Sequence, residues 1–156
     1  MNRRDSRLVW TLAAAVVLAV SGTSPAQEAP ETTEKLAARV GQFLEGISRG
    51  DTQAAFDELL RGSQLITQTE AVETLVAKTA QIPERYGQYR EFEQVDANQV
   101  GTDLVLMRYL YKCENFPVVW YFTFYRTPIP GDLSGENATW RIITVRFDTR
   151  LESLVY

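Results

Sequence analysis

Few residues of this chain could carry out covalent or metal chemistry. The sequence contains no histidine and a single cysteine, Cys113. These counts exclude a Ser-His-Asp or Cys-His nucleophile, a two-histidine metal site and a zinc ribbon. Cys113 is read as a small buried hydrophobic residue, with a reactive thiol or an intermolecular disulfide as the alternatives.

The acidic residues of the first half of the chain give no metal site either. They fall on the starts or outer faces of predicted helices, where carboxylates complement the helix dipole and solvate the surface. The Asp/Asn-rich spacing of a calcium loop is absent. The acids concerned are Glu31, Glu34, Asp57, Glu58, Glu70 and Glu73. We therefore expect neither a metal nor another cofactor.

Residues 1–26 are read as a secretory signal peptide. Three arginines precede an apolar run over 8–20, and the small-residue end is Ser24-Pro25-Ala26. The run of about 13 residues is shorter than the roughly 20 of a transmembrane helix. An uncleaved membrane anchor is the alternative. Cleavage predicts an exported protein, periplasmic or secreted, with no stable membrane insertion.

The remaining chain is long enough for one domain. About 130 residues stay after cleavage, with a net charge of about −6. A chain of that sign repels a phosphate backbone unless its cations cluster, and no such cluster is seen, so nucleic acid is not expected as a partner. We predict a flexible lead-in over 27–33 and a single domain over 34–156.

Three helices are predicted before residue 87. Apolar residues recur at helical spacing in a first helix that Thr33 caps and Gly50 ends. A second helix follows Asp51, and a third starts at the capping box Thr67-x-x-Glu70. The apolar positions are Leu36, Val40, Phe43 and Ile47, then Ala55, Phe56, Leu59 and Leu60, then Val72, Leu75, Val76 and Ala80.

After Gly87 the apolar period changes to two, and β-branched and aromatic residues predominate. This change predicts antiparallel strands over 88–96, 103–113, 118–126 and 138–147. Helices followed by such a meander give an α+β fold, with the helices packed on one face of a curved, mostly antiparallel sheet. A tight turn at Asn115 and Phe116 predicts that Tyr111 pairs with Trp120 and Tyr109 with Phe122.

The two faces of this sheet give two candidate sites. One face should lie under the helices, and its aromatic side chains either fill the core or line a pocket for a small apolar ligand. The candidate ligand-binding residues are Met107, Tyr109, Tyr111, Trp120 and Phe122. The other face has the tyrosine and arginine composition of an interface, with Arg108, Tyr121, Tyr125 and Arg126 as candidates. A solvated face is the alternative there.

Several segments together resemble the nuclear-transport-factor-2-like (SnoaL-like) α+β cone superfamily, and within it small exported bacterial proteins of unknown function. They are Gly-Asp-Thr-Gln-Ala-Ala-Phe from Gly50, Tyr86-Gly-Gln-Tyr89, the aromatic run Trp120–Tyr125 and Trp140-Arg-Ile-Ile. The resemblance covers roughly residues 33–148. It implies a cone whose open end commonly holds a pocket, and frequent pairing of two copies through the outer sheet face, and hence a homodimer.

The resemblance leaves the function open among three expectations, because fold does not choose function. The first is a non-enzymatic exported binding or accessory module of the cell envelope, with a small apolar ligand in the cone. The second is a histidine-free lyase or isomerase acting on a small apolar substrate, for which Asp96, Asp103 and Glu114 are the nearby acids. The third is a dimeric adaptor that uses the outer sheet face.

Overall fold

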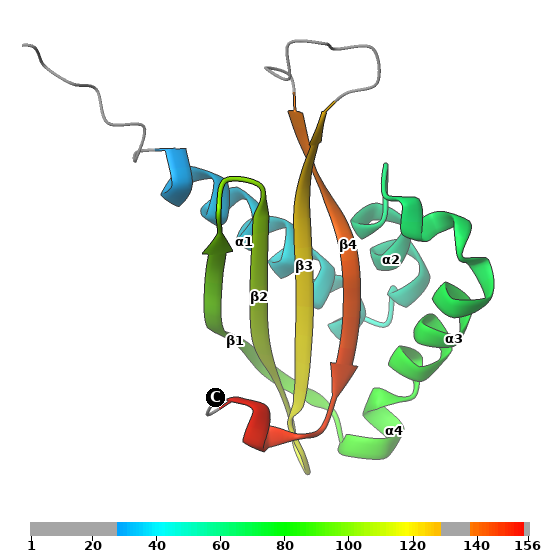
Figure 1. The fold of residues 1–156 in the computed structure, drawn as a ribbon. Coiled ribbons are helices and arrows are strands. Elements are labelled where there is room, and N and C mark those ends of the chain that lie inside the picture. The colour runs from blue at the N-terminus through cyan, green and yellow to red at the C-terminus, as the bar shows by residue number, and fades with distance from the viewer. Residues whose placement is uncertain (1–27, 129–137, 155–156) are drawn as a thin grey trace, which may run out of the picture.

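The computed structural model describes residues 28–128 and 138–154, which form helices first and then a sheet (Figure 1). The helical elements are α1 (Glu28–Ser48), α2 (Thr52–Leu59), the 3-10 turn η1 (Gln64–Thr67), α3 (Thr69–Ala80) and α4 (Ile82–Tyr86). The strands are β1 (Tyr89–Val100), β2 (Leu104–Cys113), β3 (Val118–Pro128) and β4 (Ala138–Asp148), followed by the 3-10 turn η2 (Leu151–Leu154). The predicted signal peptide lies outside the described residues.

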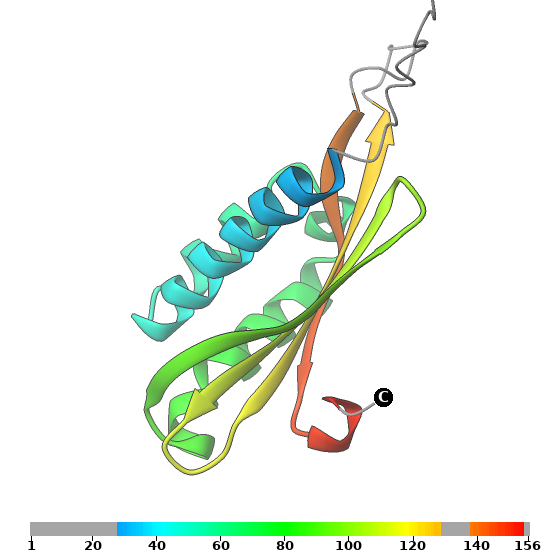
Figure 2. The same ribbon diagram turned by 90° about the vertical axis from the view of Figure 1, so that its left-hand side faces the viewer.

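The four strands form one antiparallel meander in the order β1-β2-β3-β4. The sheet is twisted and open, with β1 and β4 at its two edges. Helices α1 to α4 lie on one side of it, and η2 lies on the other (Figures 1 and 2). The structure therefore confirms the predicted α+β class, with the helices segregated to one face of an antiparallel sheet.

The first helix is longer than predicted. It begins at Glu28, so residues 28–33, predicted as a flexible lead-in, are helical, and Thr33 is not an N-cap. Pro30 falls within the first turn of α1, where its missing N–H costs no intrahelical hydrogen bond. The predicted apolar stripe is confirmed, because Leu36, Val40, Phe43 and Ile47 are all buried.

The third helix starts differently from the prediction. Thr67 ends η1 and donates its hydroxyl hydrogen to the carbonyl of Gln64 (2.8 Å), so it cannot cap α3. Helix α3 begins at Thr69 and ends at Ala80, and Pro83 falls in the first turn of the short helix α4. The capping box predicted at Thr67 and Glu70 is therefore wrong.

The pairing of β2 with β3 is shifted by two residues from the prediction. Tyr109 lies opposite Trp120, Met107 opposite Phe122 and Tyr111 opposite Val118. The shift arises because the end of β2 bonds back toward the segment before β1. Glu114 N donates to Gln88 O (3.0 Å) and Asn115 N to Tyr86 O (2.9 Å), which lengthens the turn.

A shift of two residues leaves each side chain on its predicted face, because side chains alternate along a strand. The residues predicted to lie under the helices are buried, namely Met107, Tyr109, Tyr111, Trp120, Phe122 and Phe124. On the opposite, outer face Leu106 and Tyr125 are exposed. Val119 is an exception, because it belongs to the outer face and is fully buried. The turn η2 lies over this face (Figure 2).

Candidate functional site

The five candidate ligand-binding residues come together as the centre of the core. Each of these side chains is at most 3% exposed. Phe43 of α1 meets the rings of Trp120 and Phe122 edge-on at 5.3 and 5.7 Å, and Phe56 packs on Phe43 from α2. Met107, Tyr109 and Tyr111 belong to the same cluster. The helices therefore fill the concave side of the sheet with aromatic side chains.

Two polar atoms within this core differ in how they are satisfied. The Tyr109 hydroxyl donates to Oε1 of Gln94 on β1 (2.8 Å). Trp120 Nε1 is fully buried, and no atom in the described part of the chain accepts its hydrogen. A buried donor without an acceptor carries a desolvation penalty. The Trp120 ring therefore stabilises the fold through its packing, whereas its buried N–H lowers the stability.

Because Tyr109 and Tyr111 are buried, the free energy of unfolding should decrease at alkaline pH. Burial raises the pKa of Tyr109 to about 12 and also raises the pKa of Tyr111. In the unfolded chain both phenols ionise near pH 10. Their contribution is thus complete below pH 10 and is lost as pH rises toward 12, since the unfolded state loses its protons first. We expect the urea midpoint to fall between pH 10 and 12, and Tyr109→Phe to reduce that fall.

The acids considered for isomerase chemistry lie on the surface. Asp96 binds Arg108 on the outer sheet face, Asp103 accepts a hydrogen bond from Thr102, and Glu114 accepts one from the Gln88 N–H. Each acid is thus engaged away from the buried tyrosines. Within residues 28–128 and 138–154, no group of three or more acidic or cysteine side chains could hold a metal ion.

One row of side chains crosses the whole outer face. Asp96, Arg108, Tyr121 and Arg146 are successive partners in the registers of β1, β2, β3 and β4. Arg108 Nε donates to Asp96 Oδ2 at 2.7 Å, and the Arg146 guanidinium lies 3.7 Å from the centre of the Tyr121 ring. We call these four residues the cross-sheet row.

The cross-sheet row combines charge with exposed apolar surface. Arg146 also pairs with Asp148 (2.9 Å), and the Asp96 carboxylate raises the pKa of Arg108 by accepting its hydrogen bonds. A hollow of about 430 Å³ lies on the row, with Val100 and Leu106 among its lining residues. Both are exposed, at 55% and 38%. This mixture of arginine, tyrosine and apolar side chains is typical of protein interfaces.

Three of the four predicted interface residues lie on this outer face. Arg108 and Tyr121 belong to the cross-sheet row, and Tyr125 is 43% exposed four residues further along β3. Arg126 does not join them, because strand alternation turns it to the opposite face from Tyr125. Its backbone N–H bonds Asp103 O at 2.8 Å. Arg126 is thus removed from the candidate interface.

Sequence reasoning missed Asp96 and Arg146 as members of one cluster. Asp96 was noted only as an acid near a strand end. Arg146 lies three strands away from it, on β4, and their shared row follows from register shifts within β1 and β4. The last predicted strand, 138–147, carries Arg141 and Arg146 and is followed by Asp148. This pattern of charges did not indicate which residues of the other strands they would meet.

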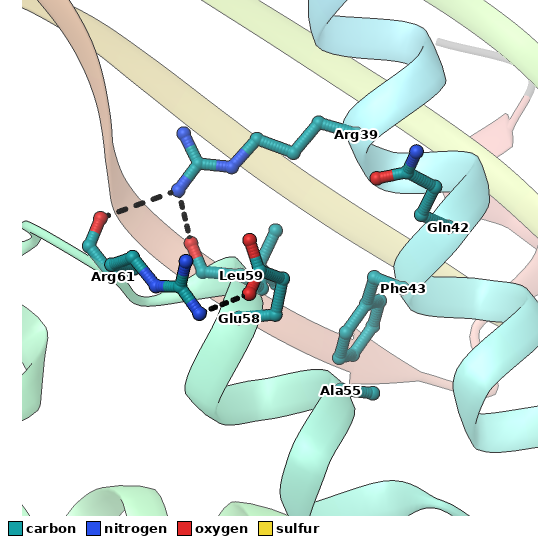
Figure 3. Close-up of a pocket in the computed structure, with 7 residues that line it drawn as sticks. All are labelled: Arg39, Gln42, Phe43, Ala55, Glu58, Leu59 and Arg61. Carbon is teal, nitrogen blue, oxygen red and sulfur yellow. Dashed lines mark hydrogen bonds and ion pairs between the residues drawn. The ribbon is translucent and has the colours of Figure 1, made fainter.

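A second hollow, of about 400 Å³, lies between α1 and α2 (Figure 3). Arg39 of α1 reaches across it and donates from Nη2 to Leu59 O (2.5 Å), at the end of α2, and from Nη1 to Trp140 O (3.4 Å) on β4. Burial lowers the pKa of Arg39. Arg61 at the rim pairs with Glu58. The Arg39 guanidinium thus donates to backbone carbonyls and links α1 to α2 and β4.

No helix among the described residues is long and apolar enough to cross a lipid bilayer. Compared with known proteins, the chain matches no family model, and neither a curated protein nor a solved structure is significantly similar to it.

Proposed function

We propose that this protein is a non-enzymatic, exported binding module of the cell envelope that acts as a dimeric adaptor through its outer sheet face. The observation that carries this proposal is the cross-sheet row and its neighbours. Arginine, tyrosine and exposed apolar side chains share one face, while the aromatic side chains of the other face are consumed by the core. The filled core leaves the outer face as the surface for recognition.

A second copy of the chain suits this face because a two-fold contact must be self-complementary. The cross-sheet row starts with the acid Asp96 on β1 and ends with the cation Arg146 on β4. A two-fold axis that runs parallel to the strands, between the two facing sheets, lays the row antiparallel to its copy. The acidic end of each copy then faces the basic end of the other. Leu106 and Tyr125 supply apolar area beside it.

Native mass spectrometry of the chain purified from its host's envelope fraction tests this proposal. We expect a mature chain that begins at Gln27 and a mass of two copies at micromolar concentration. Leu106→Lys should weaken the dimer at least about tenfold, because it buries a charge in the contact. Ile66→Lys is the matched control, since Ile66 is 55% exposed on η1.

A single-copy mass for the unmodified chain would overturn the dimeric adaptor, and full-length chain in the cytosol would overturn export. Equal dimer strength in the Leu106→Lys and Ile66→Lys variants would place the contact elsewhere on the surface. A retained apolar molecule in the spectrum would favour the second candidate, a small-ligand carrier. The unpartnered Trp120 Nε1 is the observation that favours a polar atom of such a ligand beside the core.

A further inference from the structure

Helix α3 buries less of its apolar side than its sequence pattern predicts. Its stripe of Val72, Leu75 and Val76 contacts the edge of the core, yet each of the three side chains is only partly buried. The only fully buried residue of α3 is Thr79. Figure 1 shows α3 beside the edge strand β4. An amphipathic helix at a sheet edge thus presents apolar surface that the fold itself leaves partly uncovered.

A groove separates α3 from β4. A hollow of about 310 Å³ is lined by Val72 and Leu75 of α3 and by Ile143 and Val145 of β4, among others. A second hollow of about 360 Å³ continues it toward η1. The two hollows share Leu65, Gln68 and Ile143, so they form one groove along the sheet edge. We call this the edge groove.

In the first half of β4, side chains donate hydrogen bonds to the outward backbone carbonyls. Trp140 O accepts a hydrogen bond from Arg39, and Ile142 O accepts one from Ser63 (2.5 Å). These carbonyls therefore point away from β3. Arg126, which lies opposite Trp140, donates its N–H to Asp103 on the far side of β3 from β4. Trp140 and Ile142 therefore exchange no backbone hydrogen bonds with the residues of β3 that lie opposite them, Arg126 and Phe124.

The second half of β4 offers backbone groups that have no partner within residues 28–128 and 138–154. Ile143 forms a bulge, because Ile142 lies opposite Phe124 and Thr144 lies opposite Thr123. The alternation of inward and outward backbone groups along β4 therefore begins again at Thr144. The N–H and C=O groups of Val145 and Phe147 then point outward from the sheet, as those of Ile142 do. An uncapped strand edge is a template for an added strand. The edge groove lies beside Val145, where such a strand would enter.

The charges around the edge groove define the occupant further. Among the residues that the structure describes, Lys78 and Arg141 are the charged ones that line its two hollows, and no acidic side chain lines either of them. This lining contrasts with the chain as a whole, which has a net charge of −4. A segment with acidic residues at its ends complements this rim.

We propose that the edge groove binds an extended segment of a partner protein as a fifth strand of the sheet. The segment carries apolar side chains at alternate positions and acidic residues at its ends. Its backbone pairs with Val145 and Phe147 of β4. Its apolar side chains cover Val72 and Leu75 of α3. The edge groove shares Tyr125 and Thr144 with the outer face, but its strand pairing at Val145 and Phe147 lies outside the proposed dimer contact, so either proposal can fail while the other holds.

The probe is a fluorescein-labelled peptide of sequence Asp-Thr-Val-Thr-Val-Thr-Val-Thr-Asp, added to the folded protein and followed by polarisation. We expect saturable binding that weakens with added salt. Hydrogen exchange should show new protection of the Val145 and Phe147 amides. Two N-methylated versions, one at the valines and one at the threonines, separate the two edges of the peptide. One version should lose binding and the other should keep it, because only one edge faces β4.

The matched variants are Lys78→Glu in the edge groove and Arg90→Glu on β1, at the other edge of the sheet. Both change the net charge equally, and both residues are exposed. We expect Lys78→Glu to weaken binding at least about threefold and Arg90→Glu to leave it within experimental error. Val145→Pro removes the outward N–H without removing a bond to β3, and should weaken binding further.

Equal binding of both N-methylated peptides would overturn strand addition. Absence of saturation at millimolar peptide, or protection confined to the outer face around Tyr121, would overturn the site. Protection of the Val145 and Phe147 amides in a dimer without peptide would show a second copy in the edge groove, and the partner-segment proposal would then be wrong.

Discussion

Trp120→Ala should lower the free energy of unfolding by about 3–5 kcal/mol, the largest effect expected for a single substitution in this chain. The indole is fully buried and packs against Phe43, Phe122 and Phe147, with ring centres 4.8 to 5.9 Å apart. Its removal leaves a cavity between α1 and the sheet, where both sides are held by neighbouring elements. Guanidinium unfolding followed by circular dichroism measures the loss.

Trp120→Phe is the control that separates ring packing from hydrogen bonding. Phenylalanine keeps an aromatic ring and removes the Nε1–H, which has no acceptor among the described residues. We expect a loss of less than about 1.5 kcal/mol, because the relieved desolvation penalty offsets part of the smaller ring's weaker packing. If Trp120→Phe is as damaging as Trp120→Ala, the N–H has a partner, such as a bound ligand, and the core site regains its place as a candidate.

The parts of the fold that sequence predicted are those set by periodicity. The stripe from Leu36 to Ile47 and the alternation along β2 and β3 depend only on which side of an element faces the core. A two-residue error in the β2–β3 register therefore left Tyr109 and Trp120 on the correct face. The register itself depended on the bonds of Glu114 and Asn115 to residues before β1, which no local pattern predicts.

The cross-sheet row was beyond sequence reasoning for the same physical reason. Asp96 meets Arg108 because β1 has two register shifts, between Tyr89 and Glu91 and between Gln94 and Asp96. Arg146 meets Tyr121 beyond a further shift at Ile143 in β4. Bulges arise from tertiary fit and re-aim side chains by one residue. The composition of a site that spans four strands depends on every such shift. The side chains of a core face stay on that face when the register changes by two residues.

Arg39→Ala should lower the free energy of unfolding by about 2 kcal/mol, since hydrogen bonds from charged groups contribute more than neutral ones. The substitution removes the donors to Leu59 O and Trp140 O, which belong to α2 and β4. It also removes a cation 5.8 Å from the centre of the Phe124 ring. Because the guanidinium joins α1 to both elements, we expect faster hydrogen exchange at the end of α2 and in the first half of β4.

Arg39→Lys and Arg61→Ala make this prediction specific. Lysine keeps the charge but cannot span two carbonyls on different elements, so Arg39→Lys should recover less than half of the lost stability. Arg61 lies at the rim of the same hollow, and its ion pair with Glu58 is exposed on both sides. Arg61→Ala should therefore change stability by less than about 0.5 kcal/mol. Equal losses for Arg39→Ala and Arg61→Ala would show that α1, α2 and β4 are held by their apolar contacts alone.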